Sequence, residues 1–258
     1  METQLRAKRD AGRKLLAPYL TGGLHGDEWL DVLRAVVDAG ADAVEVGIPF
    51  SDPVMDGPVI QQASARALAE GATPASVLAG LAGLARLGGA GVPLVAMTYA
   101  NVAFRPGPER FARALAGAGV AGAILPDLPV DELDEWAAAA RAAPLETVLL
   151  AAPTTPDDRL ATICERSEGW VYGVATMGVT GERSALAQTA AVMAARLKAC
   201  TDKPVLMGVG VSTPEQAAAV ATVADGVIVG AALVRRVLDG GGPAAAGAFV
   251  RNLRDALM

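Results

Sequence analysis

The stretch VEVGIPFSDPVMDGP, residues 44–58, places a glutamate inside an apolar run and follows it with a long loop punctuated by prolines. Side chains of a strand alternate between its two faces, so Glu45 lies on the face opposite to Val44 and Val46. The valine face is expected to meet helices, which turns Glu45 toward the interior of the fold. The stretch therefore predicts a buried strand of an α/β protein with a carboxyl group directed inward near its carboxyl end.

Seven further apolar runs recur along the chain, each followed by a longer alanine-rich segment with helical spacing. Eight strand–helix units in 258 residues favour a closed (β/α)8 TIM barrel over an open doubly wound sheet, which more often has five or six strands. We expect one domain over residues 1–258. The eight predicted strands are 15–21, 42–48, 92–99, 122–127, 146–152, 170–175, 204–210 and 226–231.

Helix signals fall between these runs. Asp27 opens the segment DEWLDVLRAVVDAG, and STPEQ (212–216) combines a capping Ser or Thr with a proline in the first turn. Some segments exceed the minimal unit: an opening N-terminal helix before the first strand, helical stretches at 58–70 and 74–87 after strand 2, and two short helices after strand 8. Extra helices after the eighth strand often accompany a phosphate site in barrels.

Composition narrows the class of protein. Hydrophobic residues make up 52% of the chain and charged residues 19%, which supplies a core and argues against disorder. A net charge of -6, with no visible basic patch, disfavours nucleic acid as a partner. The start METQLRAKRD lacks the apolar core of a secretion signal, and no apolar run predicts a membrane span, so we expect a cytoplasmic protein.

The reactive residue types are sparse. Cys164 and Cys200 fall in helical patterns, and we expect both to be buried free thiols. A single histidine and the absence of a CxxC motif argue against catalytic zinc. His25 lies in the loop after the first strand and is expected to be a solvated loop residue rather than a catalyst.

Glu45 is the leading catalytic candidate. Burial raises the pKa of a carboxyl group toward values useful for proton transfer. The alternative is an interior glutamate neutralised by Arg or Lys on a neighbouring strand, but the arginines lie in predicted helices and loops. No lysine lies toward the carboxyl end of a predicted strand, which also argues against a Schiff-base enzyme and against pyridoxal phosphate held by this chain. The lysines are Lys8, Lys14, Lys198 and Lys203.

The loop after Glu45 adds two carboxylates, Asp52 and Asp56. It is longer than the two to six residues usual between a strand and a helix, and long loops at this end of a barrel tend to be functional. Asp56 precedes a glycine, so an ordinary turn explains it equally well on its own. Carboxylate acid and base catalysis without metal or covalent help is the chemistry that these residues favour.

Glycines cluster at the ends of the last three predicted strands. Backbone amides at such places, or at a helix start, bind phosphate without cationic side chains. Each motif alone also fits a tight turn, but together they occupy the common phosphate position of barrels. The glycines are Gly178, Gly181, Gly208, Gly210 and Gly230.

These features together resemble the alpha subunit of tryptophan synthase over nearly the whole chain. The resemblance rests on VEVGIPFSDPVMDGPVIQ, MTYAN (97–101), PDLPVDE (126–132), MGVTG (177–181) and GVGVST (208–213). It implies a barrel without its own cofactor that cleaves indole-3-glycerol phosphate to indole and glyceraldehyde 3-phosphate. It also implies a beta subunit that carries pyridoxal phosphate, in an alpha2beta2 heterotetramer of tryptophan biosynthesis.

The resemblance also assigns roles to individual residues. It makes Glu45 the acid and base, and Asp56 the carboxylate that faces the indole N–H. Tyr172 and Tyr99 would flank these carboxylates. The implied walls of the indole site are Tyr19, Met97, Ile124 and Val209, and the implied phosphate contacts are Gly181, Gly210, Gly230 and Ala231. Thr180 and Gly208 are further predicted substrate-binding residues.

Two departures from the family pattern bear on function. The loop TGGLHGDE (21–28) lacks the Asp or Pro common there, and Ala231 stands where the family typically has a phosphate-binding serine. Two alternatives stay open at this point. One is a stand-alone lyase that releases free indole for specialised metabolism, and the other is an inactive barrel that only activates a beta subunit.

Overall fold

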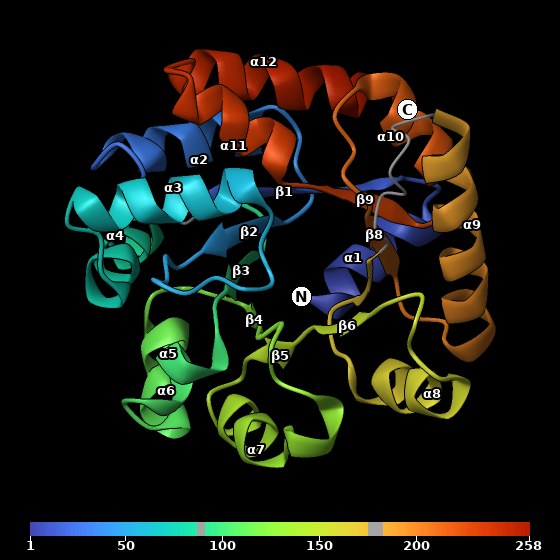
Figure 1. The fold of residues 1–258 in the computed structure, drawn as a ribbon, viewed down its shortest axis with the longest axis horizontal. Helices are drawn as coiled ribbons and strands as arrows, with labels where there is room; N and C mark the ends of the chain where they lie inside the picture. The colour runs from blue at the N-terminus through green and yellow to red at the C-terminus, as the bar shows by residue number, and fades with distance from the viewer. Residues whose placement is uncertain (87–90, 175–182) are drawn as a thin grey trace.

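The computed structural model describes residues 1–86, 91–174 and 183–258, and its strands form one parallel sheet that curls into a barrel (Figure 1). Hydrogen-bonded neighbours follow the order β5-β4-β3-β2-β1-β9-β8-β7-β6. This arrangement confirms the predicted (β/α)8 architecture. The strands are β1 (Leu15–Thr21), β2 (Val44–Gly47), β3 (Leu94–Met97), β4 (Gly122–Ile124), β5 (Glu146–Thr147), β6 (Leu149–Ala151), β7 (Val171–Val174), β8 (Val205–Gly208) and β9 (Gly226–Val229).

The predicted fifth strand is divided into β5 and β6. β5 pairs with β4, whereas β6 pairs with β7. Val148 lies between them, and its N–H still donates to the carbonyl oxygen of Ala123 at 3.0 Å. The two ends of the sheet are thus consecutive pieces of one segment, which closes the barrel. The prediction of an uninterrupted strand over 146–152 is wrong in this detail, because each half pairs with a different neighbour.

Helices surround the strands on all sides in Figure 1. The opening helix and the paired helices after β2 and β9 confirm the predicted additions, and β3 is also followed by two helices, which the sequence patterns do not predict. The helices are α1 (Glu2–Asp10), α2 (Glu28–Asp38), α3 (Pro58–Ala69), α4 (Pro74–Arg86), α5 (Ala100–Phe104), α6 (Pro108–Gly117), η1 (Val130–Glu132), α7 (Asp134–Ala142), α8 (Asp157–Arg166), α9 (Arg183–Cys200), α10 (Pro214–Ala221), α11 (Ala231–Leu238) and α12 (Gly242–Asp255).

Membrane-spanning helices were sought only among the residues that the structure describes. No single helix there has the length and apolar character that a membrane crossing requires. Only taken together do the helices α3 and α4 have the length and apolar composition of a membrane span, and they are bent by 91° relative to each other.

Alternation along the strands separates two apolar clusters. Val44 and Val46 belong to the larger cluster between strands and helices, whereas Ala43 belongs to the smaller cluster inside the barrel. The inner cluster also contains Leu5 of α1 and Trp170, both fully buried. Because α1 fills the lumen from the amino ends of the strands, a ligand must enter at their carboxyl ends, where barrel enzymes hold their active sites.

Ion pairs stabilise the end of the barrel at which the strands begin. Asp42, 1% exposed, accepts from Lys8 Nζ at 3.0 Å, Arg13 Nε at 2.7 Å and Arg254 at 3.2 Å, and from the N–H of Leu16 at 3.0 Å. All four lysines bind partners away from the carboxyl ends of the strands. Lys8 binds Asp42, Lys14 binds the carbonyl of Ala224, Lys198 binds Asp225, and Lys203 binds carbonyls at the end of α8.

Neither cysteine forms a disulfide. Cys164 is buried in α8 as predicted. Cys200 is exposed, so the prediction that both thiols are buried is wrong for this residue. It is the last residue of α9, and the last three residues of that helix, 198–200, are all exposed.

Candidate active site

Glu45 lies inside the barrel, as its alternation with the two valines predicts. Its side chain is 1% exposed, and neither carboxyl oxygen has a hydrogen-bond partner among the described residues. No cation among the described residues offsets the loss of hydration, and burial raises the pKa of Glu45 from its ordinary value of 4.5 to about 8. At neutral pH this carboxyl group is therefore mostly protonated and can donate a proton to a bound molecule.

Asp56 is half-buried at the end of the loop that follows β2. The hydroxyl of Tyr99 donates to Asp56 Oδ2 at 3.0 Å, and the same hydroxyl accepts the N–H of Met55 at 3.0 Å. The ring of Tyr99 stacks on Phe50 with 5.1 Å between centroids. Burial raises the pKa of Asp56, and the hydrogen bond from Tyr99 opposes that rise by stabilising the carboxylate.

Asp52, the other carboxylate of this loop, is exposed and accepts from the hydroxyl of Ser51 at 2.6 Å. It does not join Glu45 and Asp56. The loop is instead closed by Gln61 of α3, whose side-chain amide donates to the backbone oxygen of Asp56 at 2.8 Å. This contact fixes Asp56 relative to α3.

Two buried tyrosines flank the carboxyl groups. Tyr19 and Tyr172 are 7% and 9% exposed. Each phenol occupies space that a glycine leaves free on the next strand: a Cβ added at Gly208 would lie 2.4 Å from the ring of Tyr172. Burial raises the pKa of Tyr172 well above its ordinary value, and the charges of Glu45 and Asp56 raise it further. Tyr172 therefore stays protonated over the physiological pH range.

A cavity of about 200 Å³ opens between these side chains. It unites residues from β1, β2, β3, β7, β8 and β9 with the starts of α3 and α11. Two of its lining residues, Ile60 and Ile228, are not predicted from the sequence. Ile228 could have been found from the sequence, because it alternates along β9 with Gly226 and Gly230 and therefore faces the lumen with them. No sequence pattern places Ile60 in the cavity. The lining residues are Tyr19, Glu45, Asp56, Ile60, Met97, Tyr172, Gly208, Gly210, Ile228, Gly230 and Ala231.

One wall of this cavity is backbone. Gly210 has a positive φ of 76°, which only glycine adopts readily. Gly230 is the N-cap of α11, and Ala231 is its first residue. Free amides and the helix dipole favour an anion at such a helix start. Thr180, Gly181 and the rest of the motif 177–181 lie outside the described residues.

Three predicted site residues do not line this cavity. The hydroxyl of Tyr99 donates to Asp56, but Tyr99 itself does not line the cavity. Ile124 is buried in the lumen cluster that also contains Tyr172 and Ile228, but it does not line the cavity. Val209 belongs to the helix-side cluster, because it alternates with the lumen-facing Gly208. The geometry therefore gives the side chains of Ile124 and Val209 no part in the wall of this cavity.

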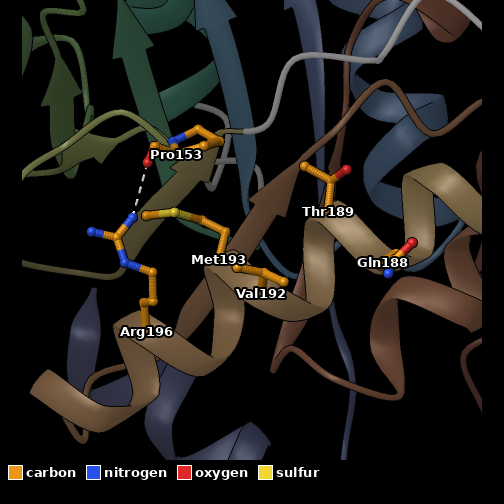
Figure 2. Close-up of a pocket in the computed structure, with 6 residues that line it drawn as sticks. All are labelled: Pro153, Gln188, Thr189, Val192, Met193 and Arg196. Atoms are coloured by element: carbon orange, nitrogen blue, oxygen red, sulfur yellow. Dashed lines mark hydrogen bonds between the residues drawn. The ribbon is translucent and has the colours of Figure 1, made fainter.

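Two other cavities lie apart from the carboxyl groups. One, of about 480 Å³, borders the loop after β2 and contains Phe50, Asn101 and Arg105. Figure 2 shows the other, about 340 Å³, between α9 and the segment after β6, where Arg196 donates to the carbonyl of Pro153 at 3.0 Å. Neither is lined by Glu45 or Asp56.

The remaining reactive side chains contribute no second centre within the part of the chain that the structure describes. No group of three or more His, Cys, Asp and Glu residues there is arranged to hold a metal. His25 is half-buried rather than solvated, and its Nε2 lies 3.0 Å from the carbonyl oxygen of Val237 in α11. The expectation of a solvated loop histidine is thus wrong, because α11 packs against this loop.

Comparisons with known proteins agree with this geometry. The family model described as tryptophan synthase alpha chain matches residues 5–248. The tryptophan synthase alpha chain of Prochlorococcus marinus is 45% identical over 95% of this chain and 90% of its own length. The Streptomyces avermitilis alpha chain is 46% identical over 96% of this chain and 90% of its own.

Solved structures give the same result. A tryptophan synthase structure from Mycobacterium tuberculosis superposes with a TM-score of 0.90 at 40% identity, covering 99% of this chain and 96% of that chain. The tryptophan synthase alpha subunit of Legionella pneumophila gives a TM-score of 0.89 at 33% identity, covering 99% and 97%. The chain described here therefore belongs to the tryptophan synthase alpha chain family.

Proposed function

We propose that this chain is a carbon–carbon lyase that cleaves indole-3-glycerol phosphate to indole and glyceraldehyde 3-phosphate. The observation that carries the proposal is the buried, unpartnered carboxyl group of Glu45, whose pKa of about 8 leaves it protonated at neutral pH beside a cavity. The function rests on this site within one barrel domain over residues 1–258.

The reaction starts with a proton transfer. The carboxyl group of Glu45 protonates C3 of the indole, which produces an iminium-like ring able to accept an electron pair. The hydroxyl on the adjacent glycerol carbon then loses its proton to Glu45 or to water, and its oxygen forms the aldehyde carbonyl. The bond between C3 and the glycerol breaks, and its electrons return to the ring and neutralise the iminium. Neither a metal nor a lysine takes part in this sequence.

Asp56 stabilises the positive charge that develops at the indole nitrogen. Its carboxylate, held by Tyr99 at 3.0 Å, faces the same cavity as Glu45. Because the nitrogen is neutral in the substrate and charged in the intermediate, the interaction is stronger in the transition state than in the ground state. The backbone at Gly210, Gly230 and Ala231 holds the phosphate, which suits a chain with a net charge of -6.

A tryptophan synthase beta subunit is the proposed partner, in an alpha2beta2 heterotetramer in which pyridoxal phosphate belongs to the beta subunit. Val54 and Met55, 78% and 60% exposed, offer apolar surface beside the site. The N–H of Met55 bonds to Tyr99, which holds Asp56, so a partner that moves this loop acts directly on a site carboxylate. A cytoplasmic location stays a prediction.

The proposal is tested by steady-state cleavage of indole-3-glycerol phosphate by the purified chain, with and without a beta subunit. Glu45→Gln should abolish cleavage while the circular dichroism spectrum is unchanged. Asp56→Asn should lower kcat, whereas Asp52→Asn, the matched control on the same loop, should behave as wild type. Turnover by Glu45→Gln at the wild-type rate would refute the role of Glu45.

The comparisons favour neither alternative function, and the same assay separates them. A stand-alone lyase would release indole at a rate that the beta subunit does not increase. An inactive activator would release none under any condition. Val54→Asp should remove the stimulation by the beta subunit and leave the rate of the isolated chain unchanged, because the side chain of Val54 points into solvent.

A further inference from the structure

The phenol of Tyr19 occupies the space where a side chain at position 47 would lie. A Cβ built on Gly47 falls 1.9 Å from the hydroxyl oxygen of Tyr19, 2.5 Å from Cζ and 2.8 Å from Cε2. No side chain larger than hydrogen fits there while Tyr19 keeps its position. Tyr19 lies on β1 directly opposite Glu45 of β2 in the strand register. Its side chain extends toward the carboxyl ends of the strands and lies over Gly47 of β2.

This position lies directly above Glu45. Gly47 is the next residue of β2 that faces the lumen beyond Glu45, on the side of the carboxyl ends. The ring of Tyr19 therefore fills the layer between the Glu45 carboxyl group and the mouth along β1 and β2. At its base the same side chain meets β9, since a Cβ at Gly230 would lie 3.6 Å from Cβ of Tyr19.

Among the described residues, the groups that surround Glu45 are all neutral or acidic. From the loop after β2 it faces Asp56, from β7 Tyr172, and from β1 Tyr19, with Tyr99 behind Asp56. Burial, followed by the charge of Asp56, raises the pKa of Tyr19, so this phenol stays uncharged. The main force on the ionisation of Glu45 is therefore the exclusion of water, and the side chain that excludes water on this side is Tyr19.

We propose that Tyr19 is a positioning residue that roofs the Glu45 carboxyl group against water, and that Gly47 is the slot that holds this roof in place. The proposal deepens the lyase function above and rests on it only for the kinetic readout. Tyr19 acts by its ring, not by its hydroxyl, so Tyr19→Phe is the conservative variant that should retain the effect.

The test is the pH profile of kcat/KM for indole-3-glycerol phosphate. Because Glu45 donates the first proton, kcat/KM of the wild type should fall as the pH rises through the pKa of Glu45. Tyr19→Ala admits water, stabilises the carboxylate and should move this descending limb to lower pH by about one unit or more. Tyr19→Phe should leave the limb in place. Gly47→Ala displaces the phenol and should shift the limb in the same direction as Tyr19→Ala.

The double variant of Gly47→Ala with Tyr19→Ala should show no further shift beyond Tyr19→Ala, because both changes remove one roof. An unmoved limb in Tyr19→Ala overturns the proposal, even if Gly47→Ala fails to fold. A second readout does not need activity: the carboxyl infrared band of Glu45, obtained as the difference from Glu45→Gln, titrated in the Tyr19→Ala background. A chain with no lyase activity but a shifted band would contradict the proposed function and support the roof.

Discussion

Replacing Glu45 by glutamine should change how the free energy of unfolding depends on pH. In the folded chain the pKa of Glu45 is about 8, and in the unfolded chain it returns to its ordinary value of 4.5. Between these values the folded state binds more protons than the unfolded state, so the stability of the wild type falls as the pH rises. Each pKa unit corresponds to about 1.4 kcal/mol, so the full cost of ionising Glu45 is about 5 kcal/mol.

Most of this loss of stability occurs between pH 5 and pH 8, where unfolding can be measured. Linkage between pH 5 and pH 8 gives a loss of about 3 to 4 kcal/mol for the wild type relative to Glu45→Gln, which has no carboxyl group to ionise there. Urea unfolding of both proteins at half-unit intervals of pH measures this difference, and all other titrating groups cancel because they are shared. Parallel stability curves for the two proteins would refute the assignment of a desolvated carboxyl group.

Three further predictions concern other parts of the barrel. Ala231→Ser adds a hydroxyl at the start of α11 and should lower KM about fivefold, equivalent to about 1 kcal/mol for one added hydrogen bond to phosphate; an unchanged KM would place the phosphate elsewhere. Asp42→Asn should cost about 2 to 3 kcal/mol in urea unfolding, because three cations lose their shared carboxylate. Thr213→Ala removes the cap of α10, whose hydroxyl accepts the N–H of Gln216, and should cost about 1 kcal/mol by the same measurement.

The order of the strands and the inward direction of Glu45 could both be predicted from the sequence, because they depend on alternation and on local runs. β1 occupies the predicted residues 15–21. The division of the fifth strand could not be predicted, since it arises from pairing with β4 on one side and β7 on the other. This pairing is decided by how the barrel closes, and it produces no recognisable pattern in the local sequence.

Some features of the candidate site could be predicted from the sequence, and others could not. Glu45 follows from its position in a strand, but the contact of Asp56 with Tyr99 joins residues 43 apart and depends on how the loop folds back. The proposed role of Gly47 depends on the direction of the Tyr19 side chain, which no sequence pattern specifies. Alternation with Gly208 would have placed Val209 on the helix side, where the structure has it, although the family resemblance assigns it to the indole wall.

His25 and Cys200 show a further limit. The environment of His25 is set by α11, 212 residues away in the chain, where Val237 lies 3.0 Å from its ring nitrogen. Cys200 is exposed together with the two residues before it, at the end of α9. In both cases the surrounding residues decide the outcome, and neither composition nor periodicity describes them.

The protonation state of Glu45 is the most direct test of the account. Infrared difference spectra between the wild type and Glu45→Gln, recorded across a pH titration, isolate the band of this one carboxyl group. We expect a protonated carboxyl band at pH 7 that disappears with a midpoint near pH 8. A carboxylate band already present at pH 6 would contradict the central claim, because a hydrated or paired Glu45 could not serve as the proton donor at neutral pH.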